Sequence, residues 1–221
     1  MNVLDAITGR QSVRAYLDRP VPPETVHAIL DAARHAPSGG NMQPWQVAVV
    51  TGATKERIGA ACIAAREADE SERPDYRYYP EQWFEPYRSR RMTCGLALYS
   101  AVGIQRGDHA ARRQAWYRNY RFFDAPVGLL FFIHRDLATG SWVDYGMFLQ
   151  NIMLAACARG LGTCPQASLA EFPDLVRGIL GVEEQWQLVC GMALGHPDPD
   201  HPLNRYRTER EPVEGFTRWY E

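Results

Sequence analysis

Two short polar segments of the chain carry residue types suited to binding a phosphorylated ligand. The first, residues 10–14, reads Arg-Gln-Ser-Val-Arg. In an extended conformation Arg10, Ser12 and Arg14 would point to one side of the backbone, since side chains alternate with a period of two. Two guanidinium groups and a hydroxyl on one face suit a phosphate monoester, which arginine holds through paired hydrogen bonds. A solvated charge cluster is the alternative interpretation.

The second segment, residues 36–45, reads Ala-Pro-Ser-Gly-Gly-Asn-Met-Gln-Pro-Trp and is a turn by composition. Glycine permits close approach of the backbone to a ligand. The amides of Asn41 and Gln43 both donate and accept hydrogen bonds, so they could pair with a ring edge that alternates N–H and C=O groups. A plain helix–strand connection is the alternative. The two segments together, flanking one amphipathic helix, predict a site for flavin mononucleotide (FMN).

Length, charge and composition set the class of protein. The chain has 221 residues, 46% of them hydrophobic, and a net charge of −2. These values favour one α/β domain over residues 1–221 and give no electrostatic reason to expect nucleic acid or an anionic membrane as partner. No apolar run reaches the roughly 18–20 residues of a bilayer span. The first residues lack a basic start followed by an apolar stretch, so we expect no signal peptide and a cytoplasmic protein.

Cysteine and lysine usage narrows the chemistry further. The five cysteines are odd in number and scattered, which favours reduced thiols over a disulfide framework. Lys55 is the only lysine, so no Gly-Lys-Ser/Thr phosphate loop exists. Its position indicates the exposed first turn of a helix, which disfavours a pyridoxal phosphate Schiff base there. The His-Pro-Asp-Pro-Asp-His run at 196–201 holds possible metal ligands, but its prolines favour a polar turn, and we predict no metal site.

Hydrophobic periodicity predicts alternating helices and strands. Val26, Ile29, Leu30 and Ala33 recur at helical spacing and predict a helix that ends before Pro37. The sequence also predicts strands at 46–50, 127–133 and 186–190 and helices at 90–102, 108–118 and 142–159, together with one helix capped by Thr54 and one from a Ser168–Glu171 capping box through Leu180. Because 127–133 is apolar throughout, we expect a central strand covered on both faces.

Three further segments carry predictions without a regular period. Residues 67–91 are acidic, aromatic and proline-bearing, which indicates either a lid-like insertion over a site or a surface loop. Residues 196–221 read as an extended C-terminal arm that wraps around a second subunit. Five aromatic side chains could wall a substrate channel or belong to the core: Trp116, Tyr117, Tyr120, Phe122 and Phe123.

Nearly the whole chain resembles the nitroreductase family of FMN-dependent oxidoreductases. The most specific matching stretches are residues 10–14 and 36–45, and others lie at 144–151, 160–163, 191–195 and 207–210. The resemblance implies an α+β, three-layer fold with a central, mainly antiparallel sheet flanked by helices. It also implies an obligate homodimer that exchanges its C-terminal arms and holds FMN at the subunit interface. The implied activity is two-electron, ping-pong reduction of nitroaromatic compounds or quinones with NADH or NADPH.

The same resemblance implies roles for individual residues. Arg10, Ser12 and Arg14 would hold the phosphate and ribityl chain, with Gln11 near the flavin. Arg207 or Arg210 would add a basic group at the phosphate. The ring would be contacted by Pro37, Ser38, Gly39 and Asn41 of the partner subunit, and by the segment Pro165, Gln166, Ala167 and Ser168. Gln43 is added as a cofactor-binding residue on the amide chemistry given above. A backbone N–H of that segment, with the predicted helix N-terminus, would stabilise negative charge on the reduced ring. No side chain is assigned as a catalytic acid or base, because the flavin carries the redox chemistry.

Two other functions remain open at this point. The first is reductive dehalogenation of a halogenated phenol, for which Glu70, Glu72 and Tyr76 would grip the substrate. The family's lysine is absent there, although Arg73 or Arg77 could replace it. The second is a non-enzymatic flavin-binding or redox-sensing module. A flavin-fragmenting branch of the family is excluded only weakly.

Overall fold

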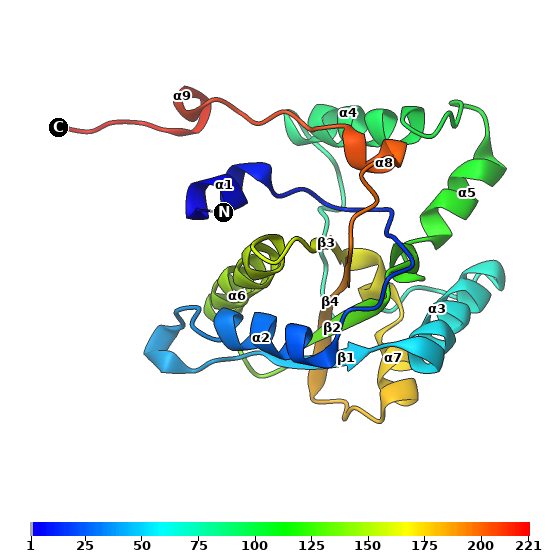
Figure 1. Ribbon diagram of the computed structural model, residues 1–221, viewed down its shortest axis with the longest axis horizontal. Coiled ribbons are helices and arrows are strands. Elements are labelled where there is room, and N and C mark those ends of the chain that lie inside the picture. The colour runs from blue at the N-terminus through cyan, green and yellow to red at the C-terminus, as the bar shows by residue number, and fades with distance from the viewer. Residues whose placement is uncertain (1) are drawn as a thin grey trace.

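A four-stranded sheet with helices on both faces forms the centre of the molecule (Figure 1). The computed structural model describes residues 2–221, and its strands lie in the order β1-β2-β4-β3 with every pairing antiparallel. The strands are β1 (Gln46–Val50), β2 (Val127–His134), β3 (Gly162–Gln166) and β4 (Trp186–Gly195). Helices α2 (Pro23–Ala33) and α6 (Thr139–Cys157) cover one face, and α3 (Gly52–Glu67) and α7 (Pro173–Leu180) the other. The predicted three-layer α+β fold is confirmed.

Strand β2 is buried on both faces of the sheet, as its unbroken apolar run predicts. Leu129, Phe131 and Ile133 pack into the hydrophobic cluster that includes α2 and α6. Leu130 and Phe132 pack into the opposite cluster, which includes α3 and α7. Successive side chains of a strand point to opposite faces, so a strand buried on both sides must be apolar at every position.

Most predicted elements lie within three residues of the observed ones. The remaining elements are α1 (Val3–Gly9), η1 (Gly39–Asn41), α4 (Tyr87–Ser100), α5 (His109–Tyr117), η2 (Phe122–Asp124), η3 (Ala167–Glu171), α8 (Pro202–Arg205) and α9 (Val213–Phe216). Helix α1 and strand β3 were not predicted, and β4 continues to Gly195, five residues beyond the predicted end.

Two predicted helix starts are wrong. Helix α3 begins at Gly52 after Thr51, and the amide of Lys55 bonds to the Thr51 carbonyl, so Thr54 lies inside the helix and does not cap it. The capping box at Ser168–Glu171 does not form either. Those residues belong to the 3₁₀ helix η3, and α7 begins separately at Pro173. Phe172, the residue before that proline, has φ −127° and ψ 61°, outside the helical region that a following proline disfavours.

Lys55 is not the exposed residue that the sequence predicts. Its side chain is half-buried, and Nζ donates a hydrogen bond to the carbonyl of Ala125, just before β2. Burial lowers the pKa of this ammonium group. Lys55 therefore joins α3 to the start of the central strand.

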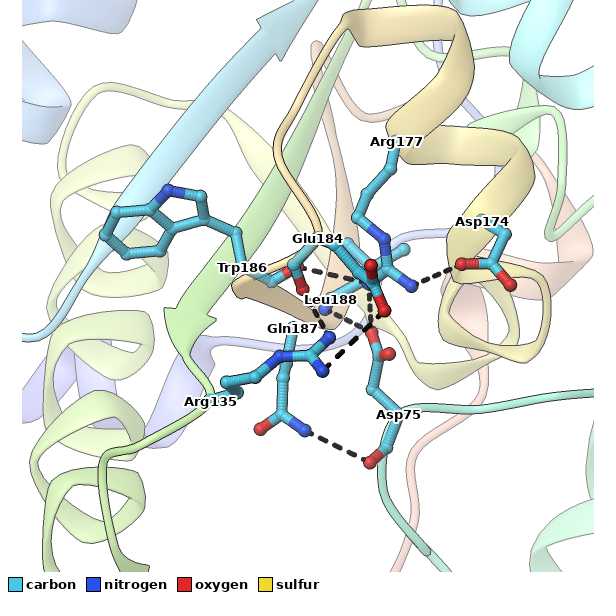
Figure 2. Close-up of polar contacts among 8 residues, drawn as sticks. All are labelled: Asp75, Arg135, Asp174, Arg177, Glu184, Trp186, Gln187 and Leu188. Atoms are coloured by element: carbon cyan, nitrogen blue, oxygen red, sulfur yellow. Dashed lines mark hydrogen bonds and ion pairs between the residues drawn. The ribbon is translucent and has the colours of Figure 1, made fainter.

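The base of the 67–91 segment is bound to the sheet and to α7. The Tyr76 hydroxyl donates to the carbonyl of Val189 at 2.6 Å. Figure 2 shows the Asp75 carboxylate between the guanidinium of Arg177 and the backbone of Leu188. These contacts fix residues 75 and 76, whereas a lid role for the rest of the segment stays a prediction.

Both ends of the chain carry exposed apolar side chains. Helix α1 lies beside the body of the protein, and the segment from α9 to the C-terminus extends away from it (Figure 1). Val3, Leu4 and Phe216 are exposed, and Trp219 retains 88% of its accessible surface. Among residues 2–221, no helix is both long enough and apolar enough to cross a bilayer.

Candidate functional site

The first of the two polar segments lies between β3 and the start of the C-terminal arm. Ser12 forms an isolated parallel bridge with Thr163, and the amide of Val13 donates to the Thr163 carbonyl at 2.9 Å. On its other side, Leu17 donates to the carbonyl of His196 at 2.9 Å. Residues 12–17 therefore run extended along two neighbouring strand ends.

Arg10, Ser12 and Arg14 all influence one buried thiol. Cys164 lies on β3, and burial raises its pKa. The positive charges of Arg14 and Arg10 and a hydrogen bond from the Ser12 side chain act in the opposite direction. The joint action of these three residues on one phosphate stays a prediction.

Asn204 is the centre of the polar contacts in this region. Its Nδ2 donates to the carbonyls of Ala15 and Asp198, both at 2.8 Å, and its Oδ1 accepts the Arg14 amide at 2.9 Å. The Asn204 carbonyl accepts from Gln11 at 2.8 Å and from Arg207 Nη1 at 3.2 Å. Asn204 thus brings Gln11, Arg14 and Arg207 together. Asn204 was not predicted as a site residue, since a single asparagine after Pro-Leu carries no local signal.

Arg207 and Arg210 differ in what their side chains contact. Arg207 reaches the carbonyl that also binds Gln11. Arg210 Nη1 instead bonds to the Thr208 hydroxyl at 2.7 Å and to the Glu209 carbonyl at 2.9 Å. Of the two arginines, only Arg207 bonds to the same group as the 10–14 segment.

The second polar segment forms a tight, exposed turn around η1. Gly40, Asn41 and Gln43 have positive φ angles of 58°, 58° and 48°. The turn is held by the Ser38 hydroxyl, which accepts the Gln43 amide at 3.0 Å, and by Asp144 of α6, whose Oδ2 accepts the Gly39 amide at 3.1 Å. Pro37 lies exposed at its start. The Gln43 side chain donates to the Asn41 carbonyl at 3.1 Å, which fixes one of the two predicted amides.

Within one chain the two polar segments do not meet. Over residues 2–221, no hydrogen bond or ion pair joins residues 37–43 to residues 10–14. The family resemblance implies that the turn of a second copy completes the site, and this stays a prediction.

The junction of β3 and η3 holds buried polar atoms without partners. Gln166 is 3% exposed; its Nε2 donates to the Asn119 carbonyl at 2.6 Å, but its Oε1 has no hydrogen-bond partner. Ser168 is 6% exposed, and its Oγ has none either. Pro165 is exposed and Ala167 half-buried. An unsatisfied buried acceptor or hydroxyl costs about 1–3 kcal/mol, so such atoms indicate a missing partner.

A cavity of about 1130 Å³ lies beside this region, between α4, α5 and the rest of the chain. Arg14 and Leu203 line it on one side, so it borders the Asn204 contacts. Of the five aromatic residues between 116 and 123, Trp116 and Phe123 line the cavity. The other three belong to the core: Tyr117, Tyr120 and Phe122.

Residues 196–201 accept hydrogen bonds from backbone amides. The carbonyl of His196 accepts the Leu17 amide, and His201 Nδ1 accepts the Leu203 amide at 3.2 Å, which caps α8. Among residues 2–221 no three His, Cys, Asp or Glu side chains are grouped as a metal site would require.

Comparison with known proteins assigns the family. The sequence profile of the nitroreductase family matches residues 7–196, most of the chain. This protein belongs to the nitroreductase family. A chloronitrobenzene nitroreductase of Comamonas testosteroni is 42% identical to this nitroreductase-family chain over 214 residues, covering 96% of the chain and 94% of the relative. A 4-nitrobenzoate reductase of Pseudomonas putida is 39% identical over 213 residues, covering 96% and 93%.

A solved structure confirms the fold of this nitroreductase-family protein. The FMN and NADPH-dependent nitroreductase NfnB from Sphigopyxis sp. strain HMH superposes with a TM-score of 0.97 at 38% identity, over 100% of both chains. The observed strand order and the helices on both faces are therefore those of a known nitroreductase.

Proposed function

We propose that this protein is an FMN-dependent oxidoreductase that uses NADH or NADPH to reduce nitroaromatic compounds, and also quinones, in a two-step, ping-pong cycle. The observation that carries the proposal is the shared contact at Asn204, which gathers the Gln11 side chain, the Arg14 backbone amide and the Arg207 side chain. Arg10 and Ser12 belong to the same 10–14 segment. The activities for which its relatives are named, on chloronitrobenzene and 4-nitrobenzoate, support the substrate class.

The basic residues of the 10–14 segment and Arg207 fit the phosphate of FMN. Arg10, Arg14 and Arg207 supply guanidinium groups, and Ser12 supplies a hydroxyl. Arginine's planar fork matches phosphate oxygens in pairs, and charge-assisted hydrogen bonds are about twice as strong as neutral ones. In this assignment Gln11 lies near the flavin, and Arg210 plays no part at the phosphate.

The polar atoms at the β3–η3 junction fit the flavin ring. Gln166 Oε1 and Ser168 Oγ are buried without partners, whereas a flavin edge offers both donors and acceptors. The Ala167 amide lies in the same stretch and would stabilise developing negative charge. The expected dipole contribution is small, because η3 has only five residues. The 37–43 turn of a second subunit would complete the ring contacts through its exposed backbone and the amides of Asn41 and Gln43.

Bound FMN supplies two-electron redox chemistry that ordinary side chains lack. The protein's own residues bind, orient and exclude water. We assign no side chain as a catalytic acid or base. The arginines hold the phosphate end, and the backbone of Pro165–Ser168 sets the electrostatic environment at the ring.

We further propose a cytoplasmic homodimer of single-domain protomers, 1–221, with FMN at the interface. Exposed apolar residues at both chain ends support it, since contiguous exposed apolar surface marks interaction sites. Val3 and Leu4 would pack against the partner, and residues 196–221 would wrap around it with Phe216 and Trp219 buried. Residues 67–91 would act as a lid whose base is fixed at Asp75.

Purified protein tests the proposal directly. We expect yellow protein with flavin absorbance, or uptake of added FMN, and oxidation of NADH or NADPH that depends on nitrobenzene. Colourless protein that refuses FMN would contradict the proposal. FMN binding without turnover of any acceptor would favour a flavin-binding module instead.

Halide release from an iodophenol distinguishes reductive dehalogenation from nitro reduction. Two of the three residues that would grip such a substrate are engaged elsewhere: Glu72 pairs with Arg66 at 2.5 Å, and Tyr76 donates to the Val189 carbonyl. We therefore expect nitro reduction without halide release.

A further inference from the structure

We propose that the cavity between α4 and α5 binds the anionic group of the electron acceptor, so that nitroarenes carrying a carboxylate are the preferred substrates. The inference rests on the function proposed above and adds the charge of the substrate to it. It assigns the recognition of that charge to Arg112 of α5 and Arg91 of α4, neither of which belongs to the candidate FMN site.

The lining of the cavity is strongly positive. Six arginines line it, and no aspartate or glutamate does: Arg14, Arg91, Arg106, Arg112, Arg118 and Arg121. Arg118 and Arg121 share the carboxylate of Asp124 at 3.5 and 3.4 Å. A cleft lined by one sign of charge raises the local concentration of the opposite ion.

Four of these arginines have no carboxylate partner. Within residues 2–221, Arg14, Arg91, Arg106 and Arg112 form no ion pair. Arg112 is half-buried, and its Nε is buried without a hydrogen-bond partner. An unpaired, partly desolvated guanidinium is costly in a folded protein, and a carboxylate with paired oxygens is the ligand that its geometry matches.

Aromatic rings hold the two assigned arginines in place and provide an apolar surface. The Arg112 guanidinium carbon lies 5.0 Å from the ring centroid of Tyr99, and that of Arg91 lies 4.8 Å from Trp83. Cation–π contacts of this kind orient a guanidinium without neutralising its charge. Rings beside fixed positive charges suit a flat aromatic molecule that bears an anion.

The cavity also reaches the candidate cofactor site. Arg14 lines it at the end assigned to the phosphate. Asn119 also lines it, and the Asn119 carbonyl accepts a hydrogen bond from Gln166 Nε2 at 2.6 Å, at the junction assigned to the flavin ring. An acceptor held by its anionic end under α4 and α5 would therefore lie next to the residues that contact the ring. The cavity volume, at about 1130 Å³, is ample for one substituted benzene ring, since ligand pockets typically measure about 300–1,000 Å³.

The test compares Arg112→Gln and Arg91→Gln with Arg113→Gln in the holoenzyme. Arg113 is the next residue of α5; it is exposed and does not line the cavity, so it controls for lost charge. For the two cavity variants we expect kcat/KM for 4-nitrobenzoate to fall about tenfold or more, as for one lost charge-assisted hydrogen bond. Nitrobenzene, which has no charge, should change less than about twofold. Arg113→Gln should leave both substrates unchanged.

Binding of benzoate, measured by calorimetry, gives a readout without turnover. We expect Arg112→Gln to weaken it by about the same factor, and Arg112→Lys to restore part of it. Flavin content and thermal unfolding show that each variant is folded. Arg91→Gln, an exposed residue, keeps the test valid if Arg112→Gln does not fold.

Three outcomes would overturn the inference. They are an equal fall for both nitroarenes, no change in either, or a rise in KM for NADPH but not NADH with the nitroarene ratio unchanged. The last would assign the arginines to the extra phosphate of NADPH. If all variants still reduce nitrobenzene and none changes benzoate binding, the inference is wrong and the proposed function holds. If benzoate binding depends on Arg112 but the protein reduces no nitroarene, the cavity binds anions and the proposed function is wrong.

Discussion

The carboxylate of Asp75 lies 2.5 Å from the guanidinium of Arg177, although 102 residues separate them in the chain. Their side chains retain only 7% and 10% of their accessible surface, for Arg177 and Asp75 respectively. Arg177 also donates to the Trp186 carbonyl at 3.1 Å, and Asp75 accepts the Leu188 amide at 2.9 Å (Figure 2). One buried pair thus joins the 67–91 segment, α7 and β4.

Removing one partner of this pair should strongly destabilise the fold. Arg177→Gln leaves a buried carboxylate without its counter-ion, which costs about 3–5 kcal/mol. The urea midpoint should fall accordingly. The double variant Asp75→Asn/Arg177→Gln should be less destabilised than the sum of the two single variants, because the residues are coupled.

The matched control for that pair is Arg34→Gln. Arg34 pairs with Asp31 at 2.7 Å on the surface, where solvent screens the interaction. Its urea midpoint should stay near wild type. An Arg177→Gln midpoint equal to that of Arg34→Gln would contradict a structural role for the buried pair.

The two C-terminal arginines should differ in their effect on the cofactor. Arg207→Gln should weaken FMN binding about tenfold, as expected for one charge-assisted hydrogen bond to a phosphate. Arg210→Gln should leave affinity near wild type, because Arg210 bonds to Thr208 and Glu209. Fluorescence titration of apoprotein with FMN measures both; a larger loss in Arg210→Gln would reverse the assignment.

Gly191 on β4 should not tolerate a side chain. A Cβ at this position would lie 2.1 Å from Leu169 Cδ1, which is fully buried in η3. Gly191→Ala should destabilise the protein by about 1–3 kcal/mol through overpacking. Chemical denaturation measures the loss, and adding Leu169→Ala should cost less than the two single changes combined.

Gly146→Ala is the control for the glycine substitution. Gly146 lies in α6, and a Cβ there would meet no atom within 4 Å. Alanine favours a helix over glycine by about 1 kcal/mol, so this variant should be as stable as wild type or more so. Equal losses in the two alanine variants would show that Leu169 does not restrict Gly191.

Buried thiols should destabilise the protein at high pH. Burial raises the pKa of Cys62 and of Cys190 to about 12. Their pKa in the unfolded chain is about 8.5, so between these values the unfolded state loses its protons first. The free energy of unfolding should therefore fall as pH rises through this window, by up to about 1.4 kcal/mol per pH unit for each thiol.

Cys62→Ala isolates one of these contributions. The variant starts less stable because of the cavity it leaves, but its stability should decline less steeply above pH 9. Iodoacetamide at pH 8 gives an independent check: Cys62 and Cys190 should react only after unfolding, whereas Cys94 is exposed and should react in the folded protein. Parallel pH curves for wild type and Cys62→Ala would refute the linkage.

Local features of the sequence predicted most of the fold. The helices α2, α5 and α6 follow from apolar residues at helical spacing, and β2 from an unbroken apolar run. These are properties of neighbouring residues, so they can be predicted without knowing what packs against them. Helix α1 also has a local signal that was missed, since Asn2 and Asp5 form a capping box.

Strand β3 shows where local reasoning fails. It contains Pro165, which lacks an N–H and argues against a strand, yet the segment pairs with β4 from Gly162↔Gly195 to Gln166↔Gly191. β3 lies at the edge of the sheet, where a proline is tolerated because one side needs no ladder partner. Its place in the sheet, and not its composition, makes it a strand.

The sequence by itself determined which residues could bind a phosphate and a flat ring, since residue type and close spacing carry that chemistry. Only the tertiary structure decided which of them meet. Asn204 joins Gln11 and Arg14, about 190 positions earlier in the chain, and the unpaired Arg112 faces a cavity that exists only when α4 and α5 are in place. Contacts between distant residues depend on how the helices pack on the sheet, and no local pattern in the sequence indicates which distant residues will meet.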